Sequence, residues 1–223
     1  MILTLMGAPG SGKGTQGRQL ARALGVAYVA SGDLIRRAMA ERTAWGEEVR
    51  SCIDQGLYVP DESIVPAFLS TLRASQAVSA VGAVLDGFPR TTEQASALDE
   101  ASRSLGFSHQ PVALVLEVPE DVLVSRLSGR WLCRGCHATY NVQSHPPHSA
   151  GVCDACGQAL EQRVDDRRDT IQQRLAIFRD STSPVLAFYG ARGGLVRVDG
   201  NQSEQAVGAA LLVAARSRAS GET

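Results

Sequence analysis

A glycine-rich stretch near the start of the chain constrains its fold more than any other feature. The stretch is Gly7-Ala8-Pro9-Gly10-Ser11-Gly12-Lys13-Gly14-Thr15, which fits the pattern Gly-x4-Gly-Lys. The apolar residues 2–6 before it are expected to form a buried strand, and residues 15–24 after it a helix that Gly25 ends. Between a strand and a helix, such glycines turn backbone N–H groups inward to bind phosphate at the helix N-terminus. The stretch therefore predicts a nucleotide phosphate-binding loop.

Lys13 is the single lysine among the 22 basic residues, and the other cations are all arginines. A lysine ammonium is a compact charge on a thin stem that fits between phosphates inside a tight loop, whereas a planar guanidinium is too wide. We therefore expect Lys13 to bridge the terminal phosphates. Gly14 stands where a Ser or Thr usually follows this lysine, and the hydroxyl comes one residue later, at Thr15.

Strand-like and helix-like segments alternate along the chain. Strands are expected at residues 2–6, 26–30, 81–85, 112–118 and 195–198. Helices are expected at residues 15–24, 33–42, 45–55, 61–76, 92–105, 120–127, 168–189 and 203–216. The helical region 168–189 must bend or break near Pro184. Continuous apolar strands separated by helices predict an α/β fold of the phosphate-loop NTPase type, with a five-stranded parallel sheet covered by helices on both faces.

Length and charge narrow the possible functions. The 223 residues can hold one sizeable core plus small insertions, and the net charge of −1 gives no electrostatic case for nucleic acid or an anionic membrane. No apolar run approaches the roughly 20 residues of a membrane helix, and the N-terminus has no signal-peptide pattern. We therefore expect a cytoplasmic protein whose thiols are reduced.

Two pairs of cysteines, Cys133-x2-Cys136 and Cys153-x2-Cys156, indicate a metal site. Four soft thiolates at this spacing fill the tetrahedral shell of a structural Zn²⁺ and leave no open position for catalysis. Two disulfides or four free thiols are the alternative, and iron could also occupy the site. Zinc would hold together a small segment with little core of its own.

A second segment with phosphate chemistry follows the third expected strand. Asp86 ends that strand and can contribute to a Mg²⁺ shell, while Arg90 lies a short turn further, where it can clamp a phosphate. Alternatively, Asp86 could be only a helix cap or turn residue, and Arg90 only a surface arginine.

The chain resembles the adenylate kinases, within the nucleoside monophosphate kinases, from residue 1 to about residue 215. The motifs that carry the resemblance are Gly7 to Gln16, Ser31-Gly32-Asp33-Leu34-Ile35-Arg36, Val59-Pro60-Asp61-Glu62, Asp86-Gly87-Phe88-Pro89-Arg90-Thr91, and Arg163 with Asp165-Asp166. The family carries Gly-Lys-Gly-Thr in its phosphate loop, which accounts for Gly14. Some of its members also carry a four-cysteine zinc lid.

The resemblance implies reversible transfer of a phosphoryl group from MgATP to AMP, giving two ADP, by a monomer that serves adenine nucleotide homeostasis. It implies a core of residues 1–30, 61–128 and 166–216, an AMP-binding insertion at 31–60, a zinc-bearing lid at 129–165 and a flexible tail at 217–223. The implied catalytic residues are Lys13, Asp86, Arg90, Arg130, Arg163 and Arg174. The implied nucleotide-binding residues are Gly10, Ser11, Gly12, Lys13, Gly14, Thr15, Ser31, Arg36, Val59, Gly87, Arg90, Gln94, Arg126, Arg130, Arg163, Arg174 and Gln202.

Within this set, Ser31 and Gln94 would contact the AMP base, Arg36 and Arg90 its phosphate, and Arg126 the adenine of ATP. The sequence departs from the family at Trp131, Leu57 and Ser144, where Arg, Lys and Phe are common. These changes concern lid packing and closure and leave the clamp arginines in place.

Three other functions compete with adenylate kinase. A sister kinase would use another monophosphate or GTP, and Ser31 with Gln94 favours AMP instead. A nucleic-acid-binding zinc ribbon conflicts with the net charge of −1. An NTP-hydrolysing switch would need a water-positioning glutamine, which is not obvious in this chain.

Overall fold

The computed structural model describes residues 1–78, 81–107, 109–136 and 138–219. At its centre is a five-stranded parallel sheet in the order β2-β3-β1-β4-β8. Its strands are β1 (Ile2–Gly7), β2 (Ala27–Ala30), β3 (Ala83–Asp86), β4 (Val112–Glu117) and β8 (Leu195–Asp199). The predicted fold class is therefore confirmed, with strand ends shifted by a residue or two.

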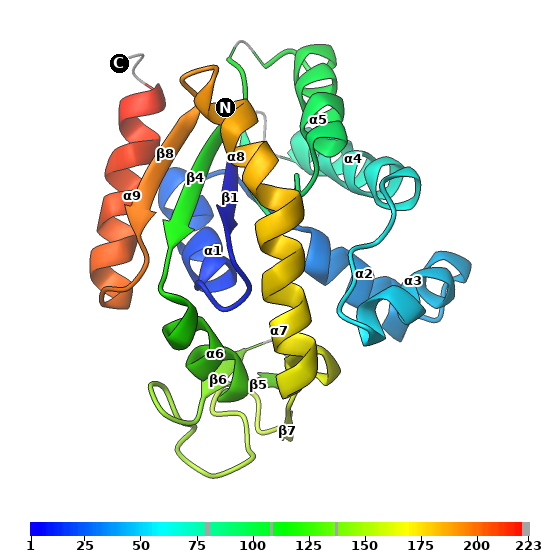
Figure 1. Cartoon of the computed structure of the whole chain (residues 1–223), viewed down its shortest axis with the longest axis vertical. Helices are drawn as coiled ribbons and strands as arrows, with labels where there is room; N and C mark the ends of the chain where they lie inside the picture. The colour runs from blue at the N-terminus through cyan, green and yellow to red at the C-terminus, as the bar shows by residue number, and fades with distance from the viewer. Residues whose placement is uncertain (79–80, 108, 137, 220–223) are drawn as a thin grey trace.

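Helices cover both faces of this sheet, which explains why β1, at its centre, is buried along its whole length (Figure 1). Leu3 and Leu5 point to the face covered by α1 (Lys13–Leu24) and α9 (Glu204–Ala219). Ile2 points to the opposite face, where α4 (Asp61–Val78) and α5 (Thr92–Ser104) pack. Met6 lies on this second face too, against α8 (Ser183–Gly190).

The strand order makes the carboxyl edge of the sheet the expected place for a ligand. From β1 the chain runs to β2 at one edge of the sheet, and from β4 it runs to β8 at the opposite edge. Connections that diverge in this way open a ligand-sized crevice beyond the carboxyl ends of the two strands. Strands β1, β4 and β8 all run toward the end of the molecule that carries β5, β6 and β7 (Figure 1).

Two segments lie outside the main sheet, as the sequence predicts. One contains α2 (Ser31–Ala40) and α3 (Ala44–Asp54), which pack so closely that a Cβ at Gly46 would lie 2.2 Å from the carbonyl oxygen of Ala38. The other forms an antiparallel sheet of β5 (Arg130–Cys133), β6 (Thr139–Asn141) and β7 (Leu160–Glu161), here called the small sheet together with its loops. The resemblance predicts a zinc-bearing lid in the second segment, and its three short strands had not been predicted.

The long helical region breaks before Pro184, as expected, but over a wider stretch. Helix α7 (Arg168–Ile177) passes into a π-helical turn, η2 (Phe178–Thr182), before α8 begins at Ser183. Because Pro184 has no N–H group, the carbonyl of Asp180 loses its α-helical donor, and the wider turn accommodates that loss. A short 3-10 turn, η1 (Val164–Asp166), precedes α7, and α6 (Glu120–Ser128) follows β4.

Helix α9 continues to Ala219, so the first residues of the expected tail are helical, and residues 220–223 lie outside the described part of the chain. Among the helices of the described residues, none is long and apolar enough to cross a membrane.

Candidate active site

The glycine-rich loop joins β1 to α1, as the motif predicts. Gly10 and Gly12 have φ values of 85° and 93°, in the left-handed region that favours glycine. At Gly10 a Cβ would also lie 2.9 Å from Cγ of Leu127, so a side chain there would collide with α6. Ser11 is buried and its N–H donates to the carbonyl of Ala8 at 3.1 Å, which closes the loop.

Lys13 begins α1 and folds back over the loop. Its Nζ donates to the carbonyl oxygens of Gly7 at 2.7 Å and Ala8 at 2.9 Å. The pKa of Lys13 is lowered to about 8, mainly by burial; Asp86 opposes this effect, and Arg90, Arg174 and Arg130 add to it. The ammonium is therefore poorly solvated and surrounded by cations, and an anion in the loop would relieve both effects.

Asp86 lies at the carboxyl end of β3, beside the loop. Its Oδ2 accepts a hydrogen bond from the Tyr28 hydroxyl at 2.8 Å, and the Arg18 guanidinium lies over the Tyr28 ring at 4.6 Å. The Tyr28 ring fits here because residue 17 is glycine, where a Cβ would lie 2.8 Å from Cε2 of the ring. Tyr28 thus orients the carboxylate next to Lys13.

A second group of side chains meets at Gly87, directly after β3. The Gly87 carbonyl accepts from Ser31 Oγ at 2.8 Å and from Arg90 Nε at 2.7 Å. Gln94 accepts from the Arg90 backbone N–H at 2.8 Å and donates to Asp61 Oδ1 at 2.6 Å. Ser31, Arg90 and Gln94, which the resemblance assigns to AMP, therefore lie together at Gly87.

Arg36 and Val59 border this group. The Arg36 guanidinium is paired with Asp33, and burial together with the nearby Arg163 lowers its pKa below the ordinary value. Val59 is 6% exposed and packs with Ile35 between α2, α3 and α4. The Val59 side chain is therefore part of the apolar packing between these helices.

Three predicted arginines gather around two adjacent aspartates. Arg130 binds Asp166 with two hydrogen bonds of 2.7 and 2.5 Å, and Arg163 binds Asp165 at 2.8 and 2.5 Å. Arg174 reaches both carboxylates, at 3.1 Å to Asp165 and 3.0 Å to Asp166.

These pairs are largely buried, so their charges interact strongly. Burial lowers the pKa of Arg174 to about 10. Burial alone would raise the pKa of the Asp165 carboxyl, but Arg163 and Arg174 outweigh it and hold that pKa at about 2. The aspartates thus hold the arginines close together against their mutual repulsion.

Arg126 and Gln202 lie near one another, beyond β8. Both terminal nitrogens of Arg126 lie 3.3 Å from the carbonyl oxygen of Gly200, and Gln202 donates to Asp199 at 3.0 Å. Gly14 is half-buried and Thr15 is exposed in the first turn of α1. The site residues predicted from the sequence therefore lie along the carboxyl edge of the main sheet and the segments beyond it.

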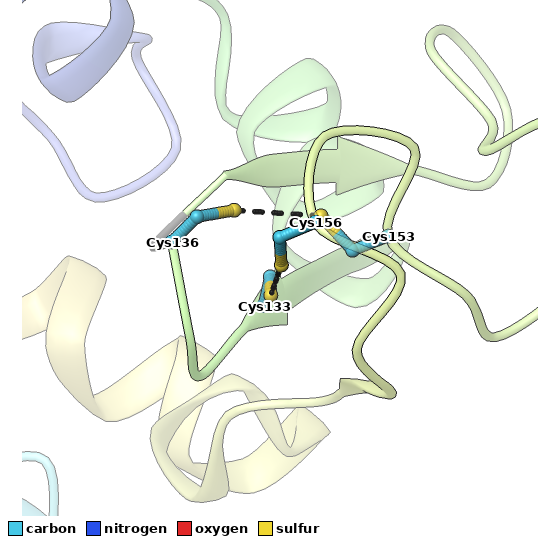
Figure 2. Close-up of side chains that lie close together, drawn as sticks. All are labelled: Cys133, Cys136, Cys153 and Cys156. Carbon is cyan, nitrogen blue, oxygen red and sulfur yellow. Dashed lines mark hydrogen bonds between the residues drawn. The ribbon is translucent and has the colours of Figure 1, made fainter.

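The four cysteines form one cluster in the small sheet. Figure 2 shows their side chains converging: Cys133 ends β5, Cys136 follows in the next loop, and Cys153 and Cys156 lie in the loop before β7. The Sγ atoms of Cys133 and Cys156 are 3.4 Å apart, as are those of Cys136 and Cys153, and all four lie within 4.8 Å of one another.

These distances fit a tetrahedral zinc site. A Zn–S bond of about 2.3 Å implies sulfur–sulfur separations of about 3.8 Å. Since the cysteines are free thiols, the disulfide alternative does not apply to this structure.

Several residues of the site were not assigned a role from the sequence. Asp61 accepts from both Thr91 Oγ1 and Gln94 Nε2 at 2.6 Å, although the sequence marked it only as part of a family motif and as the first residue of an expected helix. Tyr28 and Tyr58 contact Asp86 and Arg90 through tertiary packing, for which the sequence gives no local signal. Asp165 and Asp166 carry the family resemblance, and only the fold reveals which arginines they pair with.

The fold, the glycine-rich loop and the basic cluster define a phosphate-loop nucleotide-binding protein. The adenylate kinase family model matches residues 5–194. The chain is 40% identical to the adenylate kinase of Lachnospira eligens over 212 residues, 95% of this chain and 98% of that protein. It is 42% identical to the adenylate kinase of Symbiobacterium thermophilum over 216 residues, 97% of this chain and 99% of that protein. The chain belongs to the adenylate kinase family, and it is therefore a nucleotide-binding transferase.

Proposed function

We propose that this enzyme catalyses the reversible, Mg²⁺-dependent transfer of a phosphoryl group from ATP to AMP, giving two ADP, and so balances the adenine nucleotides. The observation that carries the proposal is the convergence of cations at one edge of the sheet. Arg90, Arg130 and Arg174 all act electrostatically on the half-buried Lys13. So much positive charge around one lysine is stabilised when polyanions bind there.

The chemistry needs positioning and charge, and no general base. The attacking group is a phosphate oxygen of AMP, which is already ionised at pH 7, so the barrier lies in bringing two polyanions into line. Lys13 and the loop N–H groups bind the donor phosphates, and Arg130, Arg163 and Arg174 neutralise charge as the phosphoryl group moves. Arg126 packs against the donor adenine beside Gln202.

The acceptor lies on the other side of the crevice. Arg36 and Arg90 bind its phosphate, while Ser31, Gln94 and the backbone of Val59 and Gly87 contact the nucleoside. When Mg²⁺ is bound with the nucleotide, it neutralises and orients the phosphates. Asp86 contributes to its shell, because its carboxylate ends β3 next to Lys13 and is held by Tyr28.

The two segments outside the main sheet have separate tasks in this proposal. Residues 31–60 bind AMP. Residues 129–165 form a lid that excludes water from the site, because water that reached the bound ATP would hydrolyse it. Structural Zn²⁺ bound by Cys133, Cys136, Cys153 and Cys156 holds the lid together. The cytoplasmic location remains a prediction from the sequence, and the monomeric state remains an implication of the family resemblance.

A coupled assay of ADP formation from MgATP, with AMP, GMP, CMP and UMP offered one at a time, tests the proposal. Turnover with AMP alone supports it and the base-selecting role of Ser31 and Gln94. Turnover with another acceptor would mean that the enzyme is a kinase for that nucleoside monophosphate. Steady hydrolysis of ATP without any acceptor, or no turnover at all, would contradict the proposal, and omission of Mg²⁺ should abolish the reaction.

A further inference from the structure

Tyr58 contacts the acceptor side of the site although no motif marks it. It lies in the connection between α3 and α4, and the Arg90 guanidinium carbon is 4.6 Å from the centre of its ring. Its hydroxyl is 3.4 Å from Oγ1 of Thr182, a buried residue in the π-helical turn η2. Tyr58 therefore spans from η2 to Arg90, whose guanidinium carbon lies over the face of its ring.

The neighbours of Arg90 show what the ring adds. Arg90 Nε donates to the Gly87 carbonyl at 2.7 Å, which fixes one edge of the guanidinium. The backbone of residue 87 has a φ of 72°, and a Cβ there would lie 2.9 Å from one terminal nitrogen of Arg90. The hydrogen bond to Gly87 and the contact with the Tyr58 ring restrain the guanidinium from two different elements.

The connection that carries Tyr58 is itself held against α7 and η2. Gly56 has a φ of 71°, and a Cβ there would lie 2.6 Å from the Thr170 side chain and 3.1 Å from that of Arg174. The Tyr58 ring therefore belongs to a stretch of backbone that packs closely against α7, the helix that carries Arg174. A support of this kind lowers the entropy that a long arginine loses when it binds a phosphate.

We propose that Tyr58 is a positioning residue, which holds the Arg90 guanidinium in the plane that binds the acceptor phosphate. The proposal rests on the proposed function, because it takes Arg90 as the ligand of that phosphate. The ring acts through its π face, which attracts the guanidinium cation and fixes the orientation of its plane. Phenylalanine should therefore replace tyrosine here, whereas leucine should not.

Direct binding of AMP without metal, measured by calorimetry, tests the proposal. We expect Tyr58→Phe to bind AMP within about twofold of the parent protein and Tyr58→Leu to bind it about fivefold more weakly, the size of one partly desolvated cation–π contact. ATP binding should stay unchanged in both variants. In the assay, Tyr58→Leu should raise KM for AMP and leave KM for ATP unaltered.

A double-mutant cycle with Arg90→Ala separates positioning from general damage. If Tyr58 acts through Arg90, Tyr58→Leu should have no further effect on AMP affinity in the Arg90→Ala background. Chemical-shift titration to millimolar AMP measures the affinity in this background. The proposal is wrong if Tyr58→Leu binds AMP like the parent, if Tyr58→Phe is equally weakened, or if the loss persists without Arg90. Equal melting temperatures would show that the variants are folded.

The parent protein is first titrated with AMP, GMP, CMP and UMP, so that the two proposals can fail separately. If another monophosphate binds best, the choice of AMP is wrong, and the Tyr58 series is carried out with that nucleotide because the phosphate is common to all four. If none binds, Arg90 holds no acceptor phosphate and both proposals fail.

Discussion

The phosphate loop and the small sheet are both encoded by short motifs, yet they keep their shape by different means. The loop is anchored between β1 and α1, and the buried side chains of Leu3, Leu5 and Leu20 tie those elements into the main core. The small sheet has a core of four buried residues, Cys133, Tyr140, Cys153 and Leu160, of which two are candidate metal ligands. One region rests on hydrophobic burial and the other on four sulfur atoms.

This difference predicts how each region responds to change. The backbone of the loop is set by glycines and a large core, so a change in its side chains should alter ligand binding and leave the fold intact. The small sheet buries too little apolar surface to be stable alone, so its folding and metal binding should be one event.

Removal of the metal should have the largest effect, and it should be confined to the small sheet. Structural zinc supplies about 10–16 kcal/mol of folding free energy in small zinc peptides. We expect about one Zn²⁺ per chain by elemental analysis of freshly reduced protein. After chelation, or in Cys136→Ser, an early calorimetric transition should appear while the main transition remains. Activity should fall as the early transition appears.

Cys52→Ser is the matched control, because this half-buried thiol lies in α3, outside the cluster. It should change neither the metal content nor the early transition. An absence of bound metal in the parent protein, or an unchanged melting profile after chelation, would contradict the comparison between the two regions.

Lys13→Arg should have the next largest effect, and here the fold should survive. The Lys13 ammonium sits between the carbonyls of Gly7 and Ala8, a space that a planar guanidinium cannot enter. We expect kcat/KM to fall by about 10²–10³-fold at an unchanged melting temperature. Lys13→Met removes the charge but keeps the thin stem. If charge alone mattered, the arginine variant would be nearly as active as the parent, and only the methionine variant would fail.

The same contrast explains what the sequence could and could not predict. The loop and the cysteine pairs were recognisable because all their functional parts lie within a few neighbouring residues. The parallel sheet followed from apolar strands that alternate with helices. Ser31, Arg90 and Gln94 were assigned by resemblance, and the structure brings them together at Gly87.

The remaining features depend on contacts between distant parts of the chain. Asp61 binds Gln94 across 33 positions, and Tyr28 reaches Asp86 across 58. The strands of the small sheet are only two to four residues long, too short for a periodic pattern to appear. The π-helical turn η2 was foreseen only as a break near Pro184, because a proline marks where a helix is disturbed and not how the chain accommodates it.

Tyr140→Phe should weaken the small sheet by a smaller amount. The Tyr140 hydroxyl accepts a hydrogen bond from the Asp154 N–H at 2.8 Å and lies 3.5 Å from Sγ of Cys153, so it orients the second cysteine pair. We expect about tenfold lower zinc affinity in competition with a chromogenic chelator, the usual scale for a group that supports a metal ligand. Tyr189→Phe is the control, since the Tyr189 hydroxyl is buried with no hydrogen-bond partner within the described residues. Equal zinc affinities in the two variants would show that the Tyr140 hydroxyl does not support the site.

The smallest expected effect concerns the loop and comes from titration of Lys13. Because burial holds its pKa at about 8 in the free protein, below the ordinary 10.5, Lys13 is half neutral at pH 8. Bound phosphate favours the charged form and raises the pKa, so nucleotide binding takes up a proton and weakens as the pH rises. Between pH 8 and pH 9 we expect ATP affinity to fall by about fivefold. Calorimetry in two buffers of different ionisation enthalpy would detect the uptake at pH 8, and the uptake should vanish in Lys13→Met.

Zinc affinity should follow no such curve, since it depends on thiolates that form as the pH rises. A parallel loss of both affinities above pH 8 would mean that the loop and the small sheet are not independent.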